Sequence, residues 1–127
     1  MANTKAVHLE SFEAAADLSA KQFYFVKLSA NRTVNVPTAI TDIPIGVLQN
    51  KPASGEAAEV MVIGRSKVSA DETLTAGQLI GTSVDGQAAL VEAGDTTVYR
   101  AGQVTIGAGA GEIAEAIINC VNLNVAP

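Results

Sequence analysis

The chain has 127 residues, a length that suits one domain built around a single core. Its formal net charge is −5, its eight Lys and Arg residues are scattered among acidic ones, and its apolar runs are short. We therefore expect neither a nucleic-acid-binding stripe nor a membrane span. Aromatic residues make up only 4%, and the apolar content consists mainly of small and β-branched side chains, which favours β structure.

The N-terminal segment, residues 1–18, contains no strong turn and no continuous apolar stretch of the kind found in signal peptides. Its beginning, "MANTKAVHLESF", alternates polar and apolar side chains, as in a strand that adds to a sheet edge. The Ala-rich stretch Leu9–Ala20 has helical propensity. Two interpretations stay open: a first strand of the domain, or an arm that is poorly ordered in the free protein. We predict the arm, with partner contacts through Thr4, Lys5, Val7, Leu9 and Phe12.

Residues 19–127 are predicted to form one β domain. The runs "QFYFVKL" (22–28), "AAEVMVIGRSKVSA" (57–70), "LTAGQLIGTSV" (74–84) and "EAIINCVNLNV" (115–125) are rich in β-branched residues. Turn signals such as Asp85-Gly86 recur about every 8–12 residues, the spacing of a sandwich or barrel. The expected fold is all-β, either a small β-barrel or a sandwich.

One phrase occurs twice. "GVLQNKPASGEAAEVMV" begins at Gly46 and "GQVTIGAGAGEIAEAII" begins at Gly102, and a shift of 56 residues aligns 19–62 with 75–118 without a gap. This predicts an internal duplication of a strand–turn–strand module. Gly46 and Gly102 are expected where backbones approach closely. Gly55, Gly86 and Gly111 are expected in tight turns, where a positive φ is needed.

The sequence offers little reactive chemistry. His8 and Cys120 are the only residues of their kinds, no phosphate-binding loop is present, and no loop collects several carboxylates. We expect no enzyme activity and no catalytic, cofactor-binding or metal-binding residues, with Cys120 buried. Two other classes are weighed: a small β carrier modified at Lys51, and a carbohydrate-binding module using Tyr24 and Tyr99.

Three stretches resemble the small capsid decoration, or cement, proteins of tailed bacteriophages: "AADLSAKQFYFVKL" (15–28), "IPIGVLQNKPASGEAAEVMVIGRSKV" (43–68) and "LTAGQLIGTSVDGQA" (74–88). The resemblance spans residues 15–120 but departs at Gln103, where the family has an apolar residue, so the path of 101–111 is less defined. It implies a structural virion protein made in the cytoplasm of a bacterial host. Such a protein would bind the outer surface of an icosahedral head as a homotrimer and bridge major capsid protein subunits.

Overall fold

The computed structural model describes residues 4–92, 97–121 and 124–125. All the regular secondary structure in these ranges is β-strand. The all-β fold class is thereby confirmed. The strands are β1 (Lys5–Ala14), β2 (Phe25–Ala30), β3 (Thr33–Asn35), β4 (Gly46–Leu48), β5 (Ala57–Ser69), β6 (Leu79–Thr82), β7 (Ala88–Leu90), β8 (Tyr99–Arg100), β9 (Gly102–Ile106), β10 (Ile113–Asn119) and β11 (Asn124–Val125).

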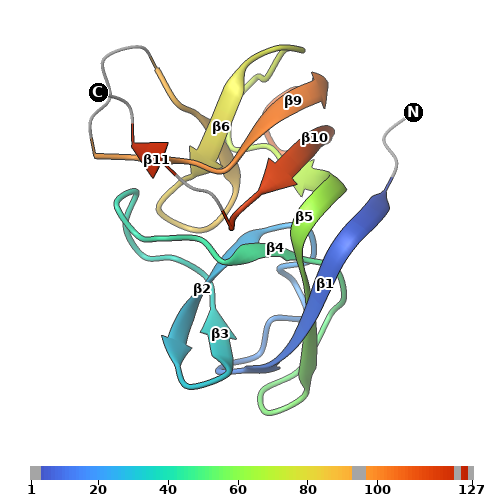
Figure 1. Cartoon of the computed structure of the whole chain (residues 1–127), viewed down its shortest axis with the longest axis vertical. Coiled ribbons are helices and arrows are strands. Elements are labelled where there is room, and N and C mark those ends of the chain that lie inside the picture. Colours follow the sequence, from blue (N-terminus) through green and yellow to red (C-terminus); the bar gives the residue numbers. More distant parts are fainter. Residues whose placement is uncertain (1–3, 93–96, 122–123, 126–127) are drawn as a thin grey trace.

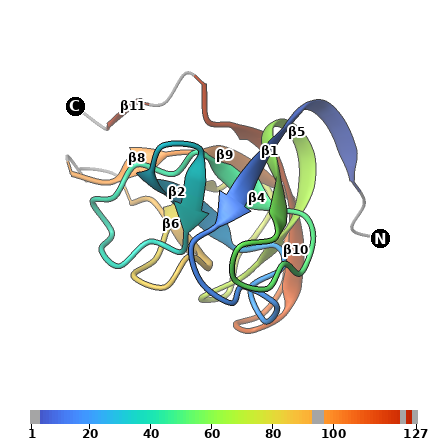
Figure 2. The same ribbon diagram turned by 90° about the horizontal axis from the view of Figure 1, so that it is seen from below.

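Nine strands form one sheet in the order β1-β3-β2-β4-β5-β10-β9-β6-β7, while β8 pairs with β11. Because β1 also pairs with β5, the strands β1, β3, β2, β4 and β5 form a closed ring. A parallel bridge between Ala70 and Ala88 closes a second ring through β5, β10, β9, β6 and β7. Figure 1 shows β5 running from one lobe into the other, and Figure 2 shows β1 beside it. The long strand β5 therefore belongs to both rings.

The two rings repeat the same hydrogen bonds at an offset of 56 residues. The N–H of Gly55 donates to the carbonyl of Ala14 at 2.8 Å, and the N–H of Gly111 donates to the carbonyl of Ala70 at 2.8 Å. Further pairs with this offset are Ala14 N–Glu56 O and Ala70 N–Glu112 O, Leu18 N–Pro52 O and Leu74 N–Ala108 O, and Ala53 N–Glu56 Oε1 and Gly109 N–Glu112 Oε1. The repeat is therefore structural and reaches the backbone of each turn.

The gap-free alignment is wrong over part of the repeat. In the first ring Phe25 pairs with Val47, and in the second Leu79 pairs with Gln103. The second members are 56 residues apart (103 − 47), but the first are only 54 apart (79 − 25). Leu79 thus corresponds to Phe25 rather than to Phe23. A two-residue slip keeps every side chain on its original face of the sheet, so the apolar pattern alone does not reveal it.

The repeat also includes the N-terminal strand. Glu13 lies opposite Ala57 across β1 and β5, and at an offset of 56 Ser69 lies opposite Ile113 across β5 and β10. β1 is therefore the counterpart of the C-terminal half of β5. This corrects the expected arm over residues 1–18: residues 5–14 are a strand of the domain's own sheet, and residues 1–3 lie outside the described ranges. Leu9–Ala20 does not form a helix despite its helical propensity, because pairing of β1 with β5 buries Phe12 and Ala14.

Each ring encloses its own apolar cluster. Every one of the eight residues in the first has its repeat counterpart in the second: Phe12 and Val68, Ala14 and Ala70, Leu18 and Leu74, Val26 and Ile80, Val34 and Ala88, Leu48 and Val104, Ala58 and Ala114, Val60 and Ala116. Several second-ring members are smaller than their counterparts. The second cluster is completed by further buried residues, among them Phe25 and Val47 from the first ring and Ile118.

We predict that Phe12→Ala lowers the free energy of unfolding by about 3–5 kcal/mol, because it empties a buried aromatic site in the first ring. The matched control on the same strand is Leu9→Ala, whose side chain is 46% exposed and which should cost less than about 1 kcal/mol. Denaturant unfolding measures both values. If Phe12→Ala were as stable as the wild type, β1 would not be an integral strand.

Candidate functional site

The described residues contain no group of three or more His, Cys, Asp or Glu side chains placed to hold a metal ion. Nor do they include a helix long and apolar enough to cross a membrane. The five residues that the sequence suggests for partner contact lie on or beside β1. Thr4, Lys5, Val7 and Leu9 are exposed, whereas Phe12 is buried in the first core. Phe12 thus supports β1 from within and is not available to a partner.

The second edge of β1 is largely open. β1 pairs with β3 only at Glu13 and Ala14, so among the described residues no strand borders the backbone of residues 5–12 on that side. The register along β5 is irregular between Ala6 and Leu9. Bulges of this kind discourage uncontrolled edge pairing. Addition of a partner strand at this edge stays a prediction.

The glycines singled out from the sequence serve the path of the chain. A Cβ on Gly46 would lie 2.3 Å from the carbonyl oxygen of Met61, and one on Gly102 would lie 2.4 Å from that of Ile117. Both glycines begin strands, where a neighbouring backbone leaves no room for a side chain. Gly55, Gly86 and Gly111 have φ values of +83°, +97° and +80°.

A single row of side chains crosses five neighbouring strands. Lys5 on β1 lies opposite Arg65 on β5, which lies opposite Ile117 on β10; Ile117 lies opposite Gln103 on β9, and Gln103 lies opposite Leu79 on β6. Directly opposed residues share a face of the sheet. Four of the five are exposed, and Arg65 is half-buried. We call this row, together with the adjoining residues Val7, Ile63 and Arg100, the outer face.

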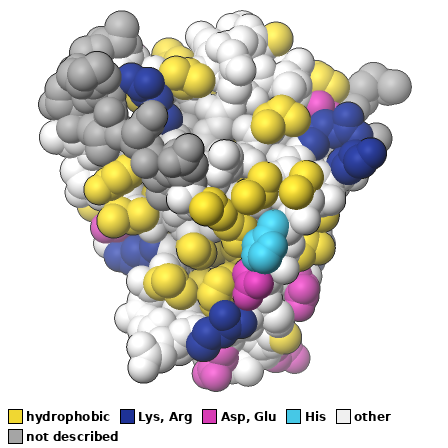
Figure 3. All heavy atoms as spheres, in the orientation of Figure 1, with side chains coloured by type: hydrophobic (Ala, Val, Ile, Leu, Met, Phe, Trp, Pro, Cys, Tyr) yellow, Lys and Arg dark blue, Asp and Glu magenta, His cyan; other side chains and the backbone are white. Residues whose placement is uncertain are grey.

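The outer face is apolar at its centre and hollowed on both sides. Val7, Ile63 and Ile117 line a hollow of about 250 Å³, and Ile117 also borders a second hollow of about 400 Å³ together with Leu79. Val7 is 74% exposed and Ile117 is 48% exposed. Figure 3 shows hydrophobic side chains gathered across the middle of this side of the molecule, with charged side chains of both signs and the histidine beside them. Contiguous apolar surface of this kind is typical of interaction sites.

Three cations surround this apolar centre. Lys5, Arg65 and Arg100 form no ion pair within the described ranges, where the ion pairs join His8 with Glu10, Lys27 with Asp42, and Arg32 with Glu10. The Nε atoms of Arg65 and Arg100 are buried without a hydrogen-bond partner in the described part of the chain. Unsatisfied buried donors are uncommon in folded proteins. Lys5 and Val7 are the two residues of the outer face that were predicted from the sequence. The others are distant along the chain and become neighbours only through strand pairing.

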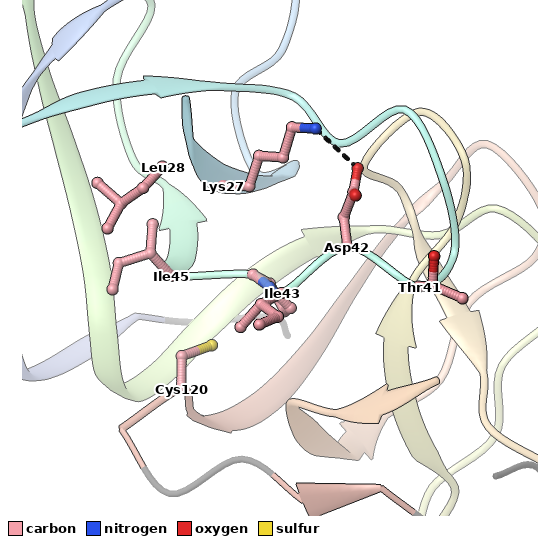
Figure 4. Close-up of a pocket in the computed structure, with 8 residues that line it drawn as sticks. Lys27, Leu28, Thr41, Asp42, Ile43, Ile45 and Cys120 are labelled. Carbon is pink, nitrogen blue, oxygen red and sulfur yellow. Dashed lines mark hydrogen bonds and ion pairs between the residues drawn. The ribbon is translucent and has the colours of Figure 1, made fainter. Parts of the chain in front are cut away.

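A third hollow, of about 550 Å³, lies beside the loop that precedes β4 (Figure 4). Lys27 and Asp42 form an ion pair of 2.9 Å at one side, and Leu28, Ile43 and Cys120 contribute apolar surface. Burial raises the pKa of Cys120 to about 12, so its thiol stays protonated at neutral pH and is a poor nucleophile.

Asp42 organises this loop. Its Oδ2 accepts hydrogen bonds from the backbone N–H of Thr38 at 2.9 Å and of Ala39 at 3.1 Å, and from Lys27 Nζ at 2.9 Å. The bond from Thr38, followed by that from Lys27, lowers the pKa of Asp42. The carboxylate is therefore used within the chain and shapes the loop.

The residues of the two other functional classes are dispersed. Lys51 is exposed in the connection between β4 and β5. Tyr24 is half-buried just before β2, with Lys21 Nζ 4.9 Å from the centre of its ring, and Tyr99 is half-buried in β8. Neither tyrosine presents a fully exposed ring.

Comparison with solved structures gives a similarity that bears on the fold. No protein-family model matches the chain, and no curated protein sequence matches it. The structure is similar to the crystal structure of the head fiber gp8.5 N base of bacteriophage phi29, with a TM-score of 0.64 and 18% sequence identity. The match covers 89% of this chain and 94% of that one. The two chains thus share a fold over nearly their full lengths.

We predict that Asp42→Asn lowers the melting temperature at pH 7 by a few degrees, because it weakens the bonds that hold the loop. A carboxylate whose pKa is lowered by folding stabilises the fold above its unfolded value, and this contribution is lost as the pH falls through the folded value. The difference from the wild type should therefore shrink below about pH 4. Thermal melts at pH 7 and pH 3 measure it.

Asp71 is the matched control, with the opposite sign. Burial, followed by repulsion from Asp85 and Glu72, raises its pKa, so its ionisation opposes folding as the pH rises. Asp71→Asn should leave the melting temperature at pH 7 unchanged or higher. A melting temperature for Asp42→Asn that equals the wild type at pH 7 would contradict the role given to this carboxylate.

Proposed function

We propose that this protein is a structural component of a tailed-phage virion that binds the outer surface of the head. The observation that carries the proposal is the fold shared with the head fiber gp8.5 N base of bacteriophage phi29, which extends over 89% of this chain. The sequence resemblance to capsid decoration proteins over residues 15–120 is independent support. Neither the β carrier nor the carbohydrate-binding module is supported by both a similar fold and a sequence resemblance.

The physical character of the surface agrees with this role. The outer face presents apolar side chains that a monomer leaves in water, as an assembly protein does before it meets its partner. Two rings that share β5 form a body with little internal freedom, because each end of that strand is fixed by a different set of neighbours. A body of this kind suits a permanent attachment.

We further propose that the protein acts as a homotrimer and bridges neighbouring major capsid protein subunits. A modest contact at each site suffices on a shell, because the contact is repeated and a trimer engages several subunits together. Bridging would stabilise the head against expansion and heat.

The test is binding to heads of the encoding phage that were assembled without this protein. We predict that the purified chain pellets with such heads to saturation and that cryo-electron microscopy shows added density on their outer surface. Heads that already carry the protein are the control, since their sites are occupied. A chain that stays in the supernatant at concentrations up to about 100 μM, where even weak sites fill, would contradict the proposal.

Bridging has its own measurement. Decorated heads should withstand a higher temperature than undecorated heads before they release their DNA. Binding without any gain in heat resistance would leave attachment in place and remove the bridging role.

A further inference from the structure

We propose that the outer face is the docking surface, and that it receives a segment of the shell protein that carries both apolar and carboxylate side chains. This inference rests on the proposed function for the identity of the partner. The face itself is defined by strand register and by the two hollows beside Ile117.

Comparison of the two repeats shows that residues of the outer face are exposed where their counterparts in the first ring are buried. By offset, the row Arg65, Ile117, Gln103 and Leu79 corresponds to the row Leu9, Met61, Val47 and Phe25 of the first ring, in which each residue likewise lies opposite the next. In that first row, Met61, Val47 and Phe25 are fully buried, and the last two pack in the core of the second ring.

Three of the four residues in the first ring's row are thus buried, and Leu9 is the exception. The three corresponding residues of the second ring, Ile117, Gln103 and Leu79, are exposed, and within the described ranges nothing covers them. Ile117 is 48% exposed and Leu79 is 38% exposed, although their counterparts Met61 and Phe25 are inaccessible to water. In repeat architectures each unit buries a face against the next one, and the final unit must be capped or made polar. Here the final row keeps Leu79 and Ile117, and a partner would supply the missing cover.

The changes along the row indicate the chemistry of that partner. Leu9 of the first row is replaced by Arg65, which lies opposite Lys5. Arg100 lines the hollow on the other side of Ile117, and none of these three cations forms an ion pair in the described part of the chain. Guanidinium groups bind carboxylates in short, charge-assisted hydrogen bonds. A carboxylate from the partner would therefore compensate cations that have no ion-pair partner in the described part of the chain.

Charge also argues against a symmetric contact between two outer faces. The chain has 13 acidic and 8 basic residues; with Lys5, Arg65 and Arg100 set aside, the remainder carries 5 − 13 = −8. The outer face thus gathers cations on an acidic protein. Two such faces in a two-fold arrangement would place cations against cations, which is unfavourable.

The shape suits an anchored contact. Ile117 forms a ridge between hollows of about 250 and 400 Å³, and the cations stand at the periphery of the apolar centre. Interfaces of this type derive affinity from a dry apolar centre and orientation from a charged rim. Ile117 is therefore expected to be the energetic centre, with Lys5 and Arg65 guiding association.

The experiment compares two matched pairs of variants by co-sedimentation with heads that lack the protein. Lys5→Glu changes the outer face, and Lys51→Glu makes the same change of charge at an exposed position elsewhere. Ile117→Asp changes the ridge, and Val84→Asp changes an exposed apolar residue outside the outer face. At low salt, both outer-face variants should bind at least about tenfold more weakly than the wild type, whereas both controls should stay within about twofold. Added salt should weaken the wild type more than Lys5→Glu.

The outcomes separate the two proposals. If the wild type binds heads and both outer-face variants bind equally well, the docking surface is wrong and the proposed function stands. If the wild type does not bind heads, the proposed function fails and this inference fails with it. If the outer-face variants bind heads normally but lose self-association in analytical ultracentrifugation, the occupant is a second copy and the inference is overturned. Circular dichroism verifies folding, and if Ile117→Asp unfolds, the Lys5 and Lys51 pair decides.

Discussion

The backbone pairing of β5 is the constraint on which the rest of this structure depends. Along its N-terminal half β5 pairs with β1 and β4, and along its C-terminal half it pairs with β10. One strand of 13 residues therefore closes the first ring and begins the second. A shift of its register by one residue would move the side chains of both cores to the opposite face, because side chains alternate along a strand. The two rings are thus fixed relative to one another by covalent continuity as well as by packing.

The duplication supplies two similar rings but not two similar surfaces. Corresponding core positions stay apolar, with smaller residues in the second ring, as in the replacement of Phe12 by Val68 and of Val34 by Ala88. Phe25 and Val47 from the first ring compensate by packing into the second core. The two rings are therefore not equivalent. Residues of the first ring pack against the second ring, whereas the corresponding residues of the second ring are exposed in the described part of the chain. This asymmetry leaves apolar side chains exposed on one face of the repeated structure.

The turns are held by a device that occurs in both rings. Glu56 accepts a hydrogen bond from the backbone of Ala53, and Glu112 accepts the equivalent bond from Gly109. The glycine before each glutamate has a positive φ and donates to the strand alongside. The repeated Gly-Glu pair that stands out in the sequence is thus a structural element of the turn. The two repeats differ instead in outward-facing strand residues, as where Arg65 takes the place of Leu9.

The sequence by itself determined the all-β class, the presence of a duplication and the turns at Gly55, Gly86 and Gly111, because these depend on local composition and on short-range backbone geometry. Only the tertiary structure decided that β1 is a strand of the domain, that the repeat slips by two residues between β2 and β6, and that an outer face exists. A two-residue slip leaves the apolar alternation unchanged, so composition carries no trace of it. The outer face joins Lys5, Arg65 and Ile117, which are far apart along the chain and become neighbours only through the register of three strands.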